Sequence, residues 1–551
     1  MIATMALAAQ IGGTHQYASA AVVSDQVLAS KVGTEILKKG GNAIDAAVAT
    51  GFVLAVTLPS AGNIGGGGFM VYRSSIGETF ALDYREIAPA AAFREMYLDS
   101  KGNPTADSFL GHRASGVPGT VAGFYAAHQK YGKLPWKDLV APAVTLAQKG
   151  FAINAQLADD LRNLADKNKQ FKGTWRIFGR SGNFYKNGEI FKQPELAKTL
   201  GRIRDMGADG FYKGETSAQI VREMTLGKGM VTAKDLADYK PEWRKALTGH
   251  YQDYDVVTMP PPSSGGVVLL MMLGMIEKDD LKSMGFNSAA TVHLMAETMK
   301  RCFADRAEYM GDPGYVSVPV SQLLSPSYLA KRRTDINPDK AASAGEIRPG
   351  LGVRHESDQT THFCVVDSEG NAVSNTYTLN ETYGSKVTVG EAGFLLNNEM
   401  DDFTSKPGVP NGYGLIQGEA NAIKPGKRPL SSMTPTILVK NGKLFLVVGS
   451  PGGPTIINTV LETILNITAH GMTTQKAVSA PRFHHQWLPD LLFAEPFALS
   501  PDTIAILKAK GHKFGVPPGG QGSCHAIQIG KNNERMVGCD PRITSAGQDG
   551  Y

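Results

Sequence analysis

The chain carries the sequence DQTTHFCVVD at residues 358–367, where a polar run turns directly into apolar, β-prone residues. The apolar half favours a strand, and the SEGN sequence at 368–371 favours a turn after it. A second strand is predicted at 372–377. The stretch therefore predicts a β-hairpin with a pair of threonines, Thr360 and Thr361, at its open end.

A threonine hydroxyl is a weak nucleophile unless a base lies beside it. The first residue of a chain has such a base, because its own α-amino group can take the proton. The pKa of an α-amino group is about 7.7–8.0, close to the pH at which a general base must work. We hypothesise that the chain cuts its own peptide bond between Gln359 and Thr360, which makes Thr360 the catalytic residue. On these residues alone, a threonine pair is far more often a sign of β-propensity at a solvated edge.

The composition is that of an ordinary globular protein. Of the 551 residues, 42% are hydrophobic and 19% charged, and the length allows several domains or one with a large core. The net charge of +5 is small and no basic run is interleaved with aromatic residues, so nucleic acid is a poor guess for a partner. The apolar run at 46–58 is too short to span a membrane and predicts a buried helix.

The N-terminus and the cysteines leave alternatives open. Residues 1–20 are a possible signal remnant or a disordered terminus, since small residues at 18–20 resemble a cleavage site but no Lys or Arg precedes them. Four cysteines are too few and too scattered for a disulfide scaffold. Cys524 and Cys539 flank a predicted hairpin, so they could form a disulfide in an oxidising compartment or remain two reduced thiols.

Helical periodicity dominates before the threonine pair, and strands with tight turns dominate after it. The polar segment 339–356 is interpreted as an exposed connector, where cleavage would do least damage. Strands with helices on both faces indicate a layered α/β sandwich. Helices are predicted at 26–39, 42–56, 121–131, 136–149, 157–164, 193–206, 217–224, 265–275, 289–310 and 455–470, strands at 69–73, 79–84 and 254–259, and a hairpin turn at 440–443.

Several glycine and charged positions fit a structural and a functional role. The glycine run at 65–68 lacks the Lys-Ser/Thr of a phosphate loop and is interpreted as close backbone packing. Arg85, at a predicted strand end, is either a surface charge or a clamp for a carboxylate. The pair Gly452 and Gly453 either packs tightly or presents N–H groups to a pocket as an oxyanion hole.

Acidic and hydroxyl residues later in the chain also fit either a structural or a functional role. By themselves, Glu399 and Asp402 would be an exposed acidic turn, and Ser431 with Ser432 would be simple turn chemistry. The adjacent histidines at 484–485 lack further ligands at useful spacing, so they are interpreted as structural and no metal is assigned.

Taken in order, short motifs resemble those of the γ-glutamyltranspeptidase (glutathione hydrolase) family over nearly the whole chain. One such motif would be weak evidence, whereas their order and spacing together are specific. The matching motifs lie at 40–43, 62–69, 83–86, 259–266, 359–362, 397–403, 428–433, 450–453 and 481–489.

The resemblance implies the N-terminal nucleophile fold, an α/β (α+β) protein built as a four-layer αββα sandwich. It implies one precursor that cuts itself into a large subunit, residues 21–359, and a small catalytic subunit, residues 360–551, which stay associated. It implies no cofactor, and relatives of this kind are commonly exported to the periplasm or outside the cell.

The resemblance also implies a role for each matching residue. Thr360 would cut the chain after Gln359 and then serve as nucleophile, supported by a hydrogen bond with Thr378. The other implied roles are oxyanion stabilisation by Gly452 and Gly453, binding of a substrate α-carboxylate by Arg85, Ser431 and Ser432, binding of its α-ammonium by Asn380, Glu399 and Asp402, and shielding by a lid loop at 407–417 that contains Tyr413.

The implied activity is that of a γ-glutamyltransferase and glutathione hydrolase. It would move the γ-glutamyl group of glutathione and other γ-glutamyl amides through a Thr360 acyl-enzyme to water or to amino acid or peptide acceptors. Glu399 stands where some relatives carry Gln, and Gly412 precedes the lid tyrosine, so the preferred acceptor stays open. The alternatives are a β-lactam (glutaryl or cephalosporin) acylase on the same fold and a small-molecule-binding protein that never cleaves.

Overall fold

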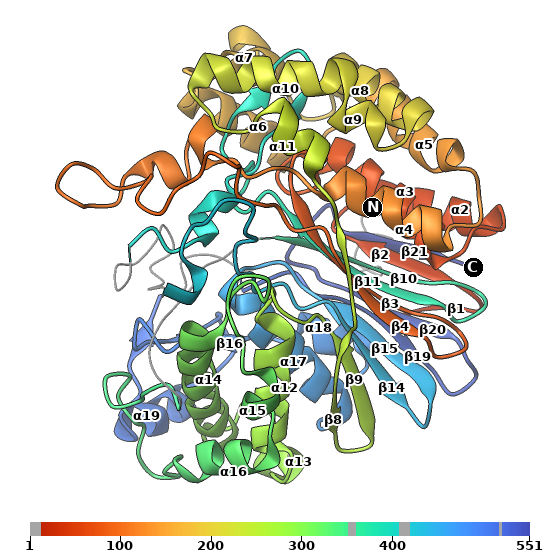
Figure 1. Ribbon diagram of the computed structural model, residues 1–551. Helices are drawn as coiled ribbons and strands as arrows, with labels where there is room; N and C mark the ends of the chain where they lie inside the picture. The colour runs from red at the N-terminus through yellow and green to blue at the C-terminus, as the bar shows by residue number, and fades with distance from the viewer. Residues whose placement is uncertain (1–12, 351–359, 407–418, 517–520) are drawn as a thin grey trace.

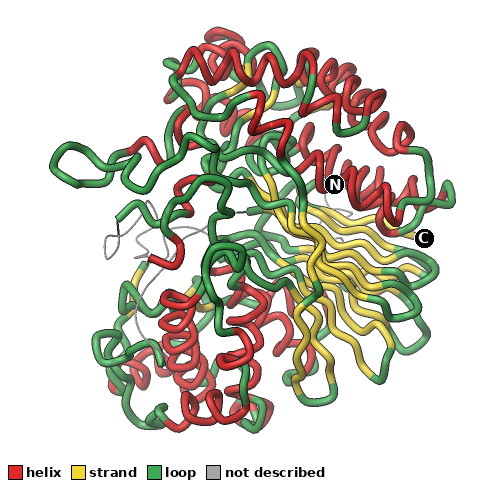
Figure 2. The backbone as a smooth tube through the Cα atoms, viewed as in Figure 1, coloured by secondary structure: helices red, strands yellow, loops and turns green. Residues whose placement is uncertain are grey.

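The computed structural model of the chain describes residues 13–350, 360–406, 419–516 and 521–551. Two seven-stranded sheets are stacked on one another, and helices cover the outer face of each (Figures 1 and 2). These four layers confirm the predicted αββα sandwich.

The first sheet has the predicted hairpin at its centre. β10 pairs antiparallel with β11, and these two strands are flanked by β2 and β3. Strands from before and after residue 360 therefore alternate within one sheet. In spatial order the strands are β21 (Gly547–Gly550), β2 (Ala21–Ser24), β10 (Thr361–Val366), β11 (Ala372–Thr378), β3 (Gly67–Arg73), β4 (Thr79–Asp83) and β7 (Glu242–Arg244).

The second sheet is also antiparallel, and it contains the hairpin predicted at 440–443. Asn441 and Gly442 have φ values of 51° and 75°, as a two-residue turn of this kind requires. In spatial order its strands are β1 (His15–Tyr17), β20 (Arg535–Cys539), β19 (His525–Ile529), β15 (Lys443–Gly449), β14 (Thr436–Lys440), β9 (Tyr254–Thr258) and β8 (Leu247–Tyr251). Shorter strands elsewhere are β5 (Phe151–Ala152), β6 (Ile190–Phe191), β12 (Thr388–Val389), β13 (Phe394–Leu395), β16 (Phe483–His484), β17 (Leu492–Ala494) and β18 (Phe514–Gly515).

Helices from the first 240 residues cover the first sheet, and α12, α14 and α17 pack on the second (Figure 1). All the predicted helices form, with ends that differ by a few residues. The helices are α2 (Val27–Lys38), α3 (Ala43–Thr57), α4 (Thr120–Tyr131), α5 (Trp136–Lys149), α6 (Ala155–Lys167), α7 (Lys172–Ile177), α8 (Pro194–Met206), α9 (Asp209–Tyr212), α10 (Gly214–Gly227), α11 (Ala233–Asp238), α12 (Gly265–Ile276), α13 (Leu281–Met284), α14 (Ala289–Tyr309), α15 (Val320–Leu323), α16 (Pro326–Thr334), α17 (Pro454–Thr468), α18 (Thr474–Ser479) and α19 (Pro501–Ala509).

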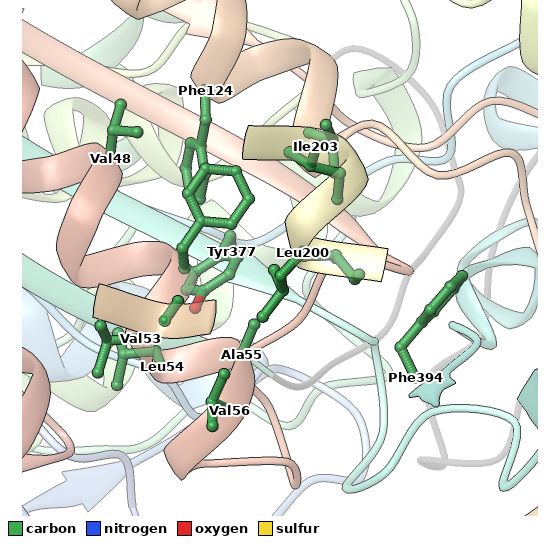
Figure 3. Close-up of a cluster of buried hydrophobic side chains, with 14 of the residues drawn as sticks. Val48, Val53, Leu54, Ala55, Val56, Phe124, Leu200, Ile203, Tyr377 and Phe394 are labelled. Atoms are coloured by element: carbon green, nitrogen blue, oxygen red, sulfur yellow. The ribbon is translucent and has the colours of Figure 1, made fainter. Parts of the chain in front are cut away.

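One apolar layer lies between the sheets, and one lies beneath each helical layer. In the outer layer of the first sheet, side chains of α3, α4 and α8 gather around Tyr377 of β11 (Figure 3). The Tyr377 hydroxyl donates a hydrogen bond to the Gly51 carbonyl of α3, 3.0 Å away. This packing fixes β11 one residue before Thr378, at the end of the strand where the candidate site lies.

Phe124 is the aromatic centre of this layer, and its removal should destabilise the fold. It is fully buried, with ring centroids 5.5 Å from Phe52 and 5.8 Å from Tyr377. We expect Phe124→Ala to lower the free energy of unfolding by about 3–5 kcal/mol, because it leaves a cavity that a packed layer cannot close. Urea unfolding should be measured in a Thr360→Ala background, where the chain is expected to stay whole.

The matched control is Phe93, whose side chain is 53% exposed. Phe93→Ala should change the free energy of unfolding by no more than about 0.5 kcal/mol. Equal effects of the two substitutions would contradict the assignment of Phe124 to the core.

Candidate active site

Thr360 directly precedes β10 and is partly exposed. In the hairpin, Thr361 stands opposite Tyr377, and continuing this register by one residue places Thr360 opposite Thr378. Thr378 in turn stands opposite Gly67 of β3. The two threonines that the sequence analysis linked therefore lie at the same end of the central strands.

Side-chain alternation decides which way Thr360 faces. Cys364 belongs to the apolar layer between the sheets, whereas its neighbour Phe363 belongs to the layer beneath the helices. Thr360 and His362 share the face of Cys364, which is the face toward the second sheet. The His362 ring packs so closely on Gly449, at the end of β15, that a Cβ there would lie 2.3 Å from it. The loop that follows β15 is thus on the side toward which Thr360 faces.

That loop carries the predicted glycine pair. Gly452 and Gly453 have φ values of 127° and 62°, which favour glycine, and Gly453 is the N-cap of α17. A Cβ on Gly452 would lie 2.8 Å from the Gly522 Cα, so close packing also requires glycine there. A helix N-terminus with exposed N–H groups is suited to negative charge. The structure therefore accounts for the glycines structurally and leaves the oxyanion role as a proposal.

The glycine run at 65–68 brings β3 against β11. A Cβ on Gly66 would lie 1.9 Å from the Thr378 carbonyl oxygen, and one on Gly68 would lie 2.4 Å from the Thr376 carbonyl oxygen. The Asn63 side chain donates a hydrogen bond of 2.8 Å to the same Thr378 oxygen. The predicted close backbone packing is confirmed, and it fixes the strand end that carries Thr378.

Arg85 is buried at 1% exposure, so its interpretation as a solvated surface charge is wrong. Its guanidinium donates to the carboxylates of Glu399 and Asp402 and, at 3.0 Å, to the Leu430 carbonyl. Glu399 and Asp402 belong to a short 3-10 helix, Glu399–Asp402, and are both buried, so the exposed acidic turn is wrong as well. Tertiary packing makes these residues one cluster of opposite charges.

Glu86, the residue after Arg85, adds a third carboxylate to this cluster, a role that no local pattern in the sequence predicts. It is fully buried, and one carboxylate oxygen lies 3.8 Å from the Arg85 Nη1. Burial raises the pKa of Glu86 to about 7, although Arg85 opposes the shift. Burial also raises the pKa of Glu399 well above its ordinary value, against Arg85 and with the help of Glu86 and Asp402. The cluster thus holds more acidic groups than one guanidinium neutralises.

Stability should depend on the protonation of Glu86. Its pKa is higher in the folded protein, at about 7, than its ordinary value of 4.5, so its contribution to stability is complete below about pH 4.5 and is lost as the pH rises through about 7. We expect the free energy of unfolding to fall over this range by up to about 1.4 kcal/mol per pH unit more steeply than in Glu86→Gln. Urea unfolding at several pH values in the Thr360→Ala background measures both slopes, and identical slopes would contradict the assignment.

Asn380 lies beside Thr378 in a backbone conformation with φ 73°. Its backbone N–H donates to the Thr378 hydroxyl oxygen at 2.7 Å, and its side-chain amide donates to the Asn398 carbonyl at 3.0 Å. Among the described residues, no donor reaches the buried Asn380 Oδ1. A buried acceptor of this kind is costly unless a ligand supplies the donor, and a substrate ammonium group would do so.

Of the two predicted serines, only Ser432 binds a second buried arginine, Arg306, which has no local signal in the sequence. Ser432 Oγ accepts a hydrogen bond of 2.6 Å from Arg306 of α14, and Arg306 also donates to Ser264 Oγ at 2.7 Å. Ser431 Oγ accepts from the Met433 N–H at 3.2 Å, as simple turn chemistry predicts. An arginine in a helical run gives no local signal of this role, because its partners are distant in sequence.

The described part of the predicted connector, residues 339–350, is mostly exposed and forms no helix or strand, as expected, but some of its side chains are anchored in the core. Ala344 and Ile347 are 1% and 5% exposed and belong to the core of the second sheet. The Ala344 carbonyl accepts a hydrogen bond of 2.7 Å from the Trp487 indole. Small apolar residues between the polar ones fill this space. Gln359 and the lid loop at 407–417 with Tyr413 lie outside the described residues.

One group among the described residues has the side chains of a metal site. His293, Glu297 and His512 are buried and close enough together to hold an ion. The two imidazoles are hydrogen-bonded at 2.8 Å, and Glu297 is already paired with Lys300 and Arg301, so we assign no metal to this group. All four cysteines are free in the structure. No helix within the described ranges combines the length and the apolar character that a membrane span needs.

Comparison with known proteins identifies the family to which the chain belongs. The four-layer sandwich, with polar groups gathered at one end of its central strands, is the architecture of the N-terminal nucleophile hydrolases. Residues 29–548 match the family model described as gamma-glutamyltranspeptidase. The chain belongs to the γ-glutamyltranspeptidase family.

Relatives over nearly the full length support this assignment. The glutathione hydrolase proenzyme of Escherichia coli K12 is 49% identical over 532 residues, which cover 96% of this chain and 91% of that protein. The glutathione hydrolase proenzyme of Bacillus subtilis 168 is 40% identical, covering 94% and 89%.

Solved structures agree with the fold. A cephalosporin acylase from Bacillus halodurans has a TM-score of 0.87 at 28% identity and covers 98% of this chain and 97% of its own. The gamma-glutamyltranspeptidase from Pseudomonas nitroreducens, complexed with L-DON, has a TM-score of 0.56 at 49% identity and covers 59% of this chain and 96% of its own.

Proposed function

We propose that this protein is a glutathione hydrolase and γ-glutamyltransferase that cuts itself between Gln359 and Thr360 and then uses Thr360 as its nucleophile. The observation that carries the proposal is the buried group of Arg85, Glu399 and Asp402 beside the end of β11. A guanidinium flanked by carboxylates complements a zwitterion, and the α-carbon of a γ-glutamyl substrate carries a carboxylate and an ammonium.

Self-cleavage comes first in the proposed sequence. The Thr360 hydroxyl attacks the Gln359 carbonyl, the amide nitrogen leaves, and an ester links Gln359 to Thr360 Oγ. Water then hydrolyses this ester, which leaves a carboxylate on Gln359 and a free α-amino group on Thr360. The two products, one that ends at Gln359 and one that begins at Thr360, stay associated because β10 and β11 lie between β2 and β3 in one hydrogen-bonded sheet.

Substrate binding uses both charges of the cluster. Arg85, with Ser431 and Ser432, would hold the α-carboxylate. Asn380, Glu399 and Asp402 would hold the α-ammonium, and Asn380 Oδ1 is the buried acceptor that awaits a donor. The ion pairs that Arg85 makes with the two acids keep these groups in place before substrate arrives.

Turnover then follows two steps at Thr360. Its α-amino group takes the hydroxyl proton, Oγ attacks the γ-carbonyl, and the N–H groups of Gly452 and Gly453 stabilise the oxyanion. The amine of the donor leaves with a proton, and a γ-glutamyl ester remains on Thr360. Water or the amine of an amino acid or peptide then attacks the ester. Thr378 supports the nucleophile, and the loop carrying Tyr413 would shield the ester.

The test compares two substrates that differ in one group. Glutaryl p-nitroanilide has the carboxylate of γ-glutamyl p-nitroanilide but lacks its ammonium. We expect a preference for the γ-glutamyl substrate of at least about 100-fold in kcat/KM, because only its ammonium offers a donor to the buried Asn380 Oδ1 and a positive charge to the carboxylates that outnumber Arg85. An equal rate, or a faster glutaryl reaction, would favour the acylase alternative. The cephalosporin acylase of similar fold shares only 28% sequence identity with this chain.

The γ-glutamyl group on Thr360 would pass to water or to the amine of an amino acid or peptide. Addition of glycylglycine should increase p-nitroaniline release if transfer competes with hydrolysis, and a rate that stays unchanged would indicate hydrolysis alone.

We infer from the family resemblance that the enzyme is located in the periplasm or outside the cell. If fractionation of the producing cells found the small fragment in the cytoplasm, this location would be wrong.

A further inference from the structure

Asp25 lies in the loop between β2 and α2 and is 2% exposed. Its Oδ2 accepts a hydrogen bond of 2.5 Å from the hydroxyl of Thr361, the residue next to the candidate nucleophile. Its Oδ1 accepts hydrogen bonds from Ser523 Oγ at 3.0 Å and from His525 Nε2 at 2.9 Å. One buried carboxylate thus connects β2, β10 and β19.

The hydrogen bond to Asp25 affects the pKa of the His525 imidazole. His525 is fully buried, and burial alone would lower its pKa, but the Asp25 carboxylate outweighs this effect and raises the pKa well above its ordinary value. The Asp25 side chain therefore favours the protonated form of His525 and accepts hydrogen bonds from three side chains of residues 360–551.

The hydrogen bond between Asp25 and Thr361 lies just beyond the end of the backbone pairing between β2 and β10. The ladder between β2 and β10 ends at the pair Ser24 and Phe363, whereas β10 runs on to Thr361. The side chain of Asp25 reaches Thr361 where the backbone pairing on this side has stopped. The loop itself is fixed, because Ser545 Oγ donates to the Asp25 carbonyl at 2.9 Å.

After cleavage, the hydrogen bond between Asp25 and Thr361 joins the two fragments next to Thr360. Asp25 lies in residues 21–359, while Thr361, Ser523 and His525 lie in residues 360–551. Once the chain is cut, Thr360 is a terminus held covalently on one side only, and chain termini fray unless they are tied down. A nucleophile that must reach a near-attack geometry loses rate when its backbone is free to move.

We propose that Asp25 is a positioning residue for the nucleophile, holding the new N-terminus of the small fragment in place through the hydroxyl of Thr361. The proposal rests on the proposed function of Thr360. It assigns Asp25 no contact with substrate, and its effect should appear in the chemical step and not in binding.

The experiment removes the hydroxyl without changing the size of the side chain. Thr361→Val should reduce kcat for γ-glutamyl p-nitroanilide by about 10- to 100-fold, with KM within about twofold. Thr361→Ser keeps a hydroxyl and should restore most of kcat. Ser523→Ala, the matched control, removes a hydroxyl that binds the same carboxylate from outside β10, and its kcat should stay within about twofold of the wild type.

A double substitution tests whether the effect passes through Asp25. If Asp25 acts by way of Thr361, Asp25→Asn combined with Thr361→Val should lose no more than about twofold beyond Thr361→Val alone, because the two residues form one contact. Melting temperatures of all variants, taken on fully cleaved protein, separate a loss of positioning from a loss of folding.

Three results would overturn the proposal: wild-type kcat in Thr361→Val, a change confined to KM, or a double variant whose losses multiply. Failure of the proposed function looks different. In that case the wild type itself is not cut before Thr360, or Thr360→Ala retains turnover, whatever Thr361→Val does.

Discussion

Thr360→Ala should leave the chain as one uncut polypeptide and reduce turnover of γ-glutamyl p-nitroanilide by about 10⁴- to 10⁶-fold. The substitution removes the atom that attacks both the Gln359 carbonyl and the substrate, and loss of a nucleophile has effects of this size in other hydrolases. A denaturing gel measures the first effect. Residues 360–551 number 551 − 359 = 192, about a third of the 58.8 kDa chain, so the wild type should give bands near two-thirds and one-third of that mass.

The control for this experiment is Thr360→Ser, which keeps a hydroxyl and should still cut and turn over. N-terminal sequencing of the smaller wild-type fragment should begin at Thr360, and mass spectrometry after a pulse of γ-glutamyl substrate should find the added group on that fragment. A fragment that begins elsewhere, or an alanine variant that cuts and turns over normally, would remove the basis of every role proposed for this site.

Asp402→Asn should reduce kcat/KM for γ-glutamyl p-nitroanilide by about 30- to 3000-fold and should reduce it much less for glutaryl p-nitroanilide. Asparagine keeps the size of the side chain but removes the negative charge that would face the substrate ammonium. Truncating one partner of a buried, hydrogen-bonded charge pair costs about 2–5 kcal/mol, which is the basis of this range. The ratio of the two substrates is the informative quantity, because only one of them carries the ammonium.

Asp401 provides a matched control in the same short helix. It is equally buried, but its Oδ1 accepts a hydrogen bond from Ser108 and not from Arg85. Asp401→Asn should therefore leave the substrate ratio within about threefold of the wild type. If Asp402→Asn kept full γ-glutamyl turnover, or if both variants changed the ratio alike, the zwitterion site would be wrong.

The candidate site was only partly visible in the sequence. The threonine pair, the glycine pair and Arg85 were found because a hairpin, a turn and a strand end are local patterns, and the family resemblance supplied their roles. Arg306 and Asp25 gave no such signal. Asp25 reaches Thr361 across 336 positions of sequence, and a single acidic residue before a helix is otherwise explained by its own loop.

Local interactions explain what the sequence determined. The helix α3 begins at Ala43 because Asn42 and Asp45 cap each other's backbone N–H groups, and both residues lie within four positions of the chain. The turn at Asn441 and Gly442 and the alternation along β10 are set in the same way, by neighbours in the chain. These features fixed the hairpin, the helices and the layered class of fold.

Long-range packing decided the rest. Whether Glu399 and Asp402 were an exposed turn or part of a buried charge cluster depended on Arg85, which is more than 300 positions away. The free energy of a charge depends on its solvation and on its partners, and both are created only when distant segments pack together. The sequence alone therefore determined the strand that begins after Thr360, and only the tertiary structure decided which charges and which hydrogen bonds surround it.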